Sequence, residues 1–191
     1  MQDKLTPEER QTLLRLAREA ITHRVKGEKL PQIDESTLTD HLREQGASFV
    51  TLTTHGELRG CIGALEAYQP LAEDVREHAV AAALEDPRFP PVSERELAGI
   101  QIEVSRLTRP SPLEYKDADE LLSKLRPHVD GVILQDGFRR ATFLPQVWEK
   151  IPSGSEFLEN LCHKMGASHD QWRRKHLEVF TYQVEEFHEE S

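Results

Sequence analysis

The chain has only two cysteines, and they stand far apart, at positions 61 and 162. This spacing excludes the disulfide framework that staples small secreted domains, so a reducing cytoplasm is the simplest location. No apolar run approaches the ~20 residues that a membrane-spanning helix needs, and no signal-peptide core follows Met1. The net charge of −10 argues against general nucleic-acid binding, which needs clustered Lys and Arg.

Several motifs that identify common enzyme sites are also absent. The chain has no phosphate-binding glycine loop followed by Lys-Ser/Thr, no His-Glu-x-x-His zinc helix and no Cys-x-x-Cys pair. The only local cluster of soft metal ligands is Cys162 and His163 with His169 and His176. Adjacent residues on a helix point about 100° apart, so Cys162 and His163 do not easily aim at one metal. The sequence therefore predicts no metal site, and it identifies no cofactor.

What the sequence does contain is an unusual hexapeptide, Leu58 to Gly63, in which an arginine and a cysteine stand close to two glycines. Cys61 is a candidate nucleophile if its surroundings lower the pKa of its thiol, which is about 8.5 in free cysteine. Arg59 is a fixed positive charge that favours the thiolate and can bind an anionic ligand through two hydrogen bonds. Gly60 and Gly63 allow a positive φ, or the close approach of a ligand or another backbone segment.

A structural interpretation of the hexapeptide stands beside the catalytic one. A lone cysteine in an apolar strand is usually a small buried hydrophobe, and the glycines can mark a bulge or a bend. The two interpretations differ in a visible feature. A catalytic Cys61 must be reachable by solvent and have a polar neighbour, whereas a structural cysteine must be buried among Leu, Ile and Phe.

The hexapeptide is predicted to begin the second arm of a β-hairpin. Residues 47–54 are rich in Thr, Val and Phe, residues 55–57 form a tight turn, and residues 58–65 return. Because alternate residues of a strand share a face, Arg59, Cys61 and Gly63 are expected on one surface. A bulge at Gly60 would break this arrangement.

The remaining periodicity predicts further helices and strands. Thr6-Pro7-Glu8-Glu9 is a capping box that starts a helix ending at Gly27. Helices are also expected at 70–85, 117–125 and 145–151, from Ser153 to Gly166, and around Trp172. Strands are expected at 99–107 and 177–187, with a second hairpin formed by 131–134 and 139–144. Since the strands come in hairpins, the predicted fold class is α+β, with a mostly antiparallel sheet flanked by helices.

The proline-rich loop from Asp86 to Pro91 is a second candidate region, because loops held rigid by proline often carry function. Arg88 or Lys164 is expected at the rim of a small pocket with Cys61 at its floor. The alternative for Asp86 and Arg88 is an ion pair that braces the loop. A catalytic thiol also needs a base within hydrogen-bond reach, and His163, Glu103 and His55 are the candidates, each of which is otherwise a surface or capping group.

Together these stretches resemble the signatures of the AMME-region gene 1 protein family, whose prokaryotic members are called AmmeMemoRadiSam system protein A. The hexapeptide is similar to the family's hallmark, and Asp86-Pro87-Arg88-Phe89-Pro90-Pro91 resembles its second signature. Residues 131–134, Gly137 and 141–148 resemble the third signature. Phe157-Leu158 with residues 161–166 resembles the fourth, although members often have other residues at Cys162, His163 and Met165.

The resemblance implies one family-type domain over residues 1–191, with an antiparallel-sheet main lobe and a smaller lobe packed against it. The family name also implies a role beside a Memo-like protein and a radical S-adenosylmethionine protein. Two functions stay open. One is an enzyme or enzyme-complex component whose cysteine performs acyl or other group transfer, or thiol redox chemistry, and the other is a non-catalytic module that binds such partners. The catalytic candidates are Cys61 and His163, and the ligand-binding candidates are Arg59, Gly60, Gly63, Asp86, Arg88 and Lys164.

Overall fold

A computed structural model describes residues 4–190 of the chain, which form two compact units. The first unit contains residues 4–108 and 185–190, and the second contains residues 109–184. Each unit combines helices with an antiparallel sheet, so the predicted α+β class is confirmed. Among residues 4–190, no helix has the length and apolar character that crossing a membrane requires.

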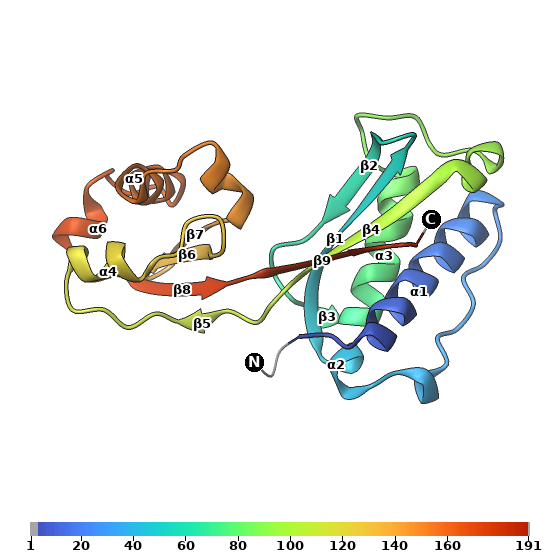
Figure 1. The fold of residues 1–191 in the computed structure, drawn as a ribbon, viewed down its shortest axis with the longest axis horizontal. Coiled ribbons are helices and arrows are strands. Elements are labelled where there is room, and N and C mark those ends of the chain that lie inside the picture. Colours follow the sequence, from blue (N-terminus) through green and yellow to red (C-terminus); the bar gives the residue numbers. More distant parts are fainter. Residues whose placement is uncertain (1–3, 191) are drawn as a thin grey trace. The chain divides into compact units, whose positions relative to one another are not determined.

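The first unit is a sheet with two long helices, α1 and α3, on one face (Figure 1). The strands follow the order β2-β1-β4-β9, and a short strand, β3, pairs with the beginning of β1. The strands are β1 Gln45–Thr54, β2 Glu57–Gly63, β3 Gln69–Pro70, β4 Ile100–Leu107 and β9 Val184–His188. The helices are α1 Pro7–Val25, α2 Asp40–Arg43 and α3 Leu71–Leu84, with 3₁₀ turns η1 Glu35–Thr37 and η2 Glu94–Gly99.

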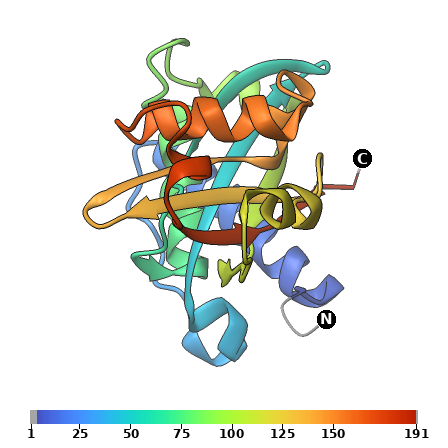
Figure 2. The same cartoon turned by 90° about the vertical axis from the view of Figure 1, so that its left-hand side faces the viewer.

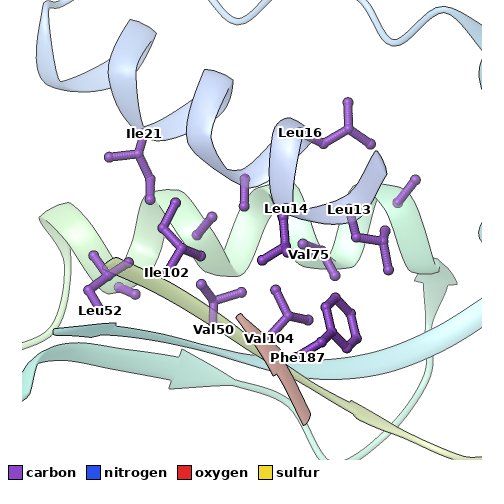
Figure 3. Close-up of a cluster of buried hydrophobic side chains, with 14 of the residues drawn as sticks. Leu13, Leu14, Leu16, Ile21, Val50, Leu52, Val75, Ile102, Val104 and Phe187 are labelled. Atoms are coloured by element: carbon purple, nitrogen blue, oxygen red, sulfur yellow. The ribbon is translucent and has the colours of Figure 1, made fainter. Parts of the chain in front are cut away.

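The core of this unit lies between the sheet and the two long helices, as Figure 3 shows. Alternate strand residues such as Val50 and Val104 are fully buried there, against Leu13 and Ile21 of α1 and Val75 of α3. The opposite face of the sheet, which we call the outer face, therefore carries the intervening residues of each strand. This alternation decides which side chains can form a site on the sheet.

The second unit contains a four-stranded sheet in the order β5-β8-β6-β7. Figure 2 shows α5 lying over the β6–β7 hairpin, and Trp148 stacks on Phe157 of α5 with ring centroids 3.7 Å apart. Trp148 is completely buried and anchors the core of this unit. The strands are β5 Ser111–Pro112, β6 Gly131–Asp136, β7 Arg139–Phe143 and β8 Glu178–Tyr182. The helices are α4 Ala118–Lys124, α5 Gly154–Lys164 and α6 Gln171–Arg174, with the 3₁₀ turn η3 Pro145–Glu149.

The prediction of a single final strand at 177–187 is wrong. The segment forms two strands in different sheets, β8 in the second unit and β9 in the sheet of the first. The alternation of buried residues is interrupted at Gln183, between Tyr182 and Glu185, both of which are buried. The Gln183 side-chain amide donates to Asp130 Oδ1 at 3.0 Å. The sequence shows only near-continuous alternation, which does not reveal a change of sheet.

Candidate functional site

Strand β2 is an edge strand of the first unit's sheet, and its pairing with β1 contains a bulge. Cys61 pairs with Thr51 and Gly60 pairs with Leu52, but the next pair skips Arg59. Arg59 is therefore the extra residue of the bulge. The sequence pattern predicts strict alternation, with Arg59 and Cys61 on the same face of the strand. The bulge next to Gly60 interrupts this alternation.

Arg59 is held by a carboxylate of the protein itself. Its Nε donates to Glu96 Oε1 of η2 at 2.8 Å, and its side chain is only 14% exposed. Hydrogen bonds from Arg59 and then from Ser93 lower the pKa of Glu96 to about 2. Among the described residues, the buried Nη1 of Arg59 has no hydrogen-bond partner. Arg59 thus links strand β2 to η2, while its Nη1 has no hydrogen-bond partner among the described residues.

Gly60 and Gly63 allow close packing, which is one of the two roles foreseen for them. A Cβ at Gly60 would lie 2.1 Å from the carbonyl oxygen of Ala82 in α3. A Cβ at Gly63 would lie 2.4 Å from the carbonyl oxygen of Ser48 and 2.5 Å from the ring of Phe49. Neither glycine has a positive φ. Because Gly60 faces α3, its neighbour Cys61 faces the outer side of the sheet.

Cys61 is half-buried and has a hydroxyl group beside its sulfur. The Thr51 hydroxyl donates to Sγ at 3.3 Å. The backbone N–H of Cys61 points to the free edge of β2 and donates to Asp86 Oδ2 at 2.9 Å. Cys61 and Thr51 are therefore a non-hydrogen-bonded pair of the ladder, the geometry in which opposite side chains come closest.

Asp86 and Arg88 cover the free edge of β2 at Cys61. The Asp86 carboxylate accepts from the Cys61 N–H, and from the backbone N–H, Nε and Nη2 of Arg88 at 2.7–3.0 Å. Arg88 Nη2 also donates to the Cys61 carbonyl at 3.3 Å. The hydrogen bonds from Arg88, followed by the one from Cys61, hold the pKa of the Asp86 carboxyl well below its usual range. The pair thus makes the hydrogen bonds to the Cys61 backbone that a neighbouring strand would make. The Arg88 side chain nevertheless stays 54% exposed.

The other two candidates, His163 and Lys164, belong to the second unit, at the end of α5. The His163 ring stacks on His169 with centroids 5.0 Å apart. Lys164 Nζ donates to the Thr142 carbonyl at 2.9 Å and lies over the Phe143 ring. The contacts of Cys61 described above are all made by residues of the first unit.

Sequence reasoning missed Thr51 and Glu96. Thr51 could be placed opposite Cys61 only with the exact turn and the bulge known, because each residue of shift changes the pairing. Glu96 lies 37 positions from Arg59, and no local pattern joins them.

A buried polar cluster on α3 was also missed. Asp74 accepts from the Ser48 hydroxyl at 2.6 Å and lies 3.2 Å from His78 Nδ1, and all three residues are buried. Burial lowers the pKa of His78, but the hydrogen bond with Asp74 and the charges of Asp74 and Glu77 outweigh it and raise that pKa. The available signal was the spacing of Asp74 and His78, four residues apart on one helix face.

Comparison with known proteins decides the family. A family model described as AMMECR1 matches residues 14–187. The chain belongs to the AMMECR1 family. This confirms the resemblance to the AMME-region gene 1 proteins that the four signatures predicted.

Similar proteins come from archaea. A protein of Methanothermobacter thermautotrophicus is 40% identical over 191 residues, which cover 97% of each chain. Protein MK0488 of Methanopyrus kandleri is 40% identical over 198 residues, covering 100% of this chain and 93% of that protein. The crystal structure of the uncharacterized protein PH0010 from Pyrococcus horikoshii has 35% identity and a TM-score of 0.70, covering 93% of this chain and 90% of that one.

Proposed function

We propose that this AMMECR1 protein is an enzyme, or a component of an enzyme complex, that transfers a group through a nucleophilic thiol at Cys61. The observation that carries the proposal is that Cys61 is only half-buried and has the Thr51 hydroxyl 3.3 Å from its sulfur. Cys162 provides the contrast within the same chain. It is fully buried in an apolar cluster, and this burial raises the pKa of its thiol. Cys61 therefore fits the description of a reactive cysteine, and Cys162 that of a structural one.

The reaction class that fits is acyl transfer. The Cys61 sulfur attacks the carbonyl carbon of an acyl donor, a C–S bond forms, and the bond to the leaving group breaks. The leaving group departs with its electron pair and takes up the proton of the thiol. An acceptor then attacks the thioester and releases Cys61. The exposed part of the Arg88 guanidinium, which reaches the Cys61 carbonyl, is placed to bind an anionic part of the donor.

Asp86 is unsuited to be the base of this reaction, although it lies next to Cys61. Its carboxylate already accepts four N–H groups, and its lowered pKa makes it a weak proton acceptor. We assign it instead to holding Cys61 and Arg88 in place at the edge of β2.

Alkylation of the folded protein tests the reactivity of Cys61. In a Cys162→Ser background, mass spectrometry measures the rate at which iodoacetamide modifies Cys61 at neutral pH. We expect modification without unfolding. Thr51→Val should slow it about threefold to tenfold, because a single hydrogen bond contributes about 0.5–1.5 kcal/mol. Thr51→Ser, which keeps the hydroxyl, should react like the parent. Modification that requires denaturant would show that Cys61 is structural and would end the proposal.

Transfer itself is tested with a panel of acyl thioesters and activated esters. We expect an acyl adduct on Cys61, found by peptide mapping, that disappears when an amine or thiol acceptor is added. Cys61→Ser is the matched control, since a serine hydroxyl has nearly the same size but is a much weaker nucleophile at neutral pH. An equal adduct yield in the serine variant would place the chemistry elsewhere.

The second candidate function is a non-catalytic module that binds a Memo-like protein and a radical S-adenosylmethionine protein, the partners that the family resemblance implies. The observation that favours it is the exposure of Leu58, Leu65 and Tyr68, three large apolar side chains on β2 and the segment after it. Calorimetry with the purified partners discriminates the two functions. Under the binding-module hypothesis, Leu58→Ser and Tyr68→Ser weaken the complex, and Cys61→Ser leaves both the complex and its activity unchanged.

A further inference from the structure

A row of polar side chains crosses the outer face of the first unit's sheet. Cys61 of β2 pairs with Thr51 of β1, and Thr51 pairs with Glu103 of β4. Glu103 lies on the outer face because its neighbours Ile102 and Val104 are fully buried in the core. One thiol, one hydroxyl and one carboxylate thus lie side by side on three adjacent strands.

The fourth strand extends the row. The backbone N–H of Glu189 donates to the Ile102 carbonyl at 3.0 Å, which fixes how β9 lies against β4. The ion pair between Arg106 and Glu185 lies further along the same two strands and shows that they are antiparallel. This register puts His188, an exposed residue, opposite Glu103.

The hydrogen-bond pattern shows that Glu103 lies directly opposite Thr51 on the neighbouring strand. Because Cys61 and Thr51 form a non-hydrogen-bonded pair, the backbone of Thr51 bonds to β4, and Thr51 and Glu103 form a hydrogen-bonded pair. The Cα atoms of such a pair are about 5.5 Å apart, a distance that a glutamate side chain spans. The Glu103 carboxylate is half-buried, and it makes no hydrogen bond or ion pair with any residue from 4 to 190.

We infer that Glu103 accepts the proton of Cys61 through the hydroxyl of Thr51. This inference rests on the proposed function. As the sulfur attacks the acyl carbon, the Thr51 hydroxyl turns from Sγ, to which it donates in the structure, towards the Glu103 carboxylate. The thiol proton then passes to Thr51 Oγ1, and the hydroxyl proton passes to Glu103. The leaving group departs with the bonding electron pair and takes a proton from the Thr51 hydroxyl, which recovers its own proton from Glu103, so the carboxylate is regenerated. Glu103 does not touch the sulfur and is therefore a positioning residue.

Other titratable and charged groups surround this relay. On the outer face, His188 stands opposite Glu103, and Glu186 is exposed two residues before it on the same strand. At the edge of β2, Arg88 lies next to Cys61. Glu186 provides a matched control, because its removal takes one negative charge from the same face without touching the row.

The pH dependence of acylation separates proton transfer from a structural role. In a Cys162→Ser background, 4-nitrophenyl acetate acylates Cys61, and the rate is measured from about pH 5.5 to pH 9. At about pH 6, we expect Glu103→Gln to be at least about tenfold slower than the parent, a modest part of what a positioned base contributes to catalysis. At pH 9 the two rates should converge, since hydroxide in solution then removes the thiol proton and a protein base is no longer needed. Glu103→Asp should restore part of the rate, and Glu186→Gln should behave like the parent.

Three outcomes would contradict the inference. The same loss at every pH would mean that Glu103 acts only on the structure. A faster reaction in Glu103→Gln would mean that the carboxylate merely repels the negative charge of the sulfur. Equal rates at every pH would mean that Glu103 takes no part, while Cys61 remained reactive and the proposed function stood. If Cys61 of the folded parent is not acylated at any pH, the proposed function fails, and the inference fails with it.

Discussion

Replacing Gly60 by alanine tests whether the close approach of β2 to α3 holds the first unit together. The added methyl group would lie 2.1 Å from the carbonyl oxygen of Ala82, whereas ordinary contact begins at 3.4 Å. The two backbones must therefore separate by about 1.3 Å, the difference between these distances. The end of α3 is not free to move alone, because the backbone N–H of Val92 donates to the Ala83 carbonyl at 2.8 Å.

The cost follows from two opposing contributions. Overpacking a close-packed core costs about 1–3 kcal/mol, and a clash with a backbone atom lies at the upper end of this range. Alanine also restricts the unfolded chain more than glycine does, which returns about 0.5–1 kcal/mol. We expect Gly60→Ala to lower the free energy of unfolding of the first unit by about 2 kcal/mol. For a unit of this size, that is a fall in melting temperature of about 10 °C.

Two optical probes make the measurement specific. Both tryptophans, Trp148 and Trp172, lie in the second unit, so their fluorescence follows that unit, whereas far-ultraviolet circular dichroism follows both. The loss is expected in the circular dichroism transition. The control is Gly99→Ala, whose new methyl group would meet nothing closer than the Thr54 Cγ2 at 4.0 Å. This variant should stay within about 0.5 kcal/mol of the parent.

A Gly60→Ala protein that melts with the parent would refute this reasoning. It would mean that β2 and α3 can separate at almost no cost, and that the glycine is not needed for packing. A large loss in Gly99→Ala would be equally damaging, since it would show that any change at a glycine of this unit is destabilising.

Three further predictions concern titratable groups. The folded-state pKa of His78 is raised, so the stability that protonated His78 adds is present below its unfolded pKa of about 6.5 and is lost as the pH rises through the folded value. In urea unfolding, the stability advantage of the parent over His78→Gln should therefore shrink above neutral pH. A difference that stays constant with pH would contradict this. The pKa of Asp86 is lowered, so Asp86→Asn should be destabilised at neutral pH, and the gap should close as the pH falls below the ordinary carboxyl range, as thermal melts at several pH values would show. Cys162 is fully buried and its pKa is raised, so a thiol reagent should modify it only in denaturant; labelling of the folded protein at this position would be evidence against the apolar core of the second unit.

Local patterns predicted much of the fold. The capping box at Thr6 and Glu9 is present, with the Thr6 backbone N–H donating to Glu9 at 2.8 Å, and α1 begins at Pro7 as expected. The residue before Pro87 disfavours the helical region, and α3 indeed ends at Leu84. These signals work because capping and proline sterics involve only residues that are neighbours in the sequence.

The candidate site was only partly predictable. Cys61 and its place on a hairpin strand followed from residue types, and so did the loop that carries Asp86 and Arg88. The bulge at Arg59 did not, because an extra residue in one strand leaves no mark in the pattern of residue types. Without the bulge, the partners of Arg59 and Cys61 cannot be assigned.

The family, the α+β class and the presence of a thiol in a glycine-containing strand were all predictable from the amino-acid sequence. These properties depend on local spacing and on motifs, which a chain carries whether or not it is folded. Three features became visible only in the folded chain. Glu96 binds Arg59, Asp86 and Arg88 cover the edge of β2, and Thr51 and Glu103 line up with Cys61. Those contacts join residues that lie far apart in the chain, and they depend on strand register and on the packing of α3, which one residue of shift would change.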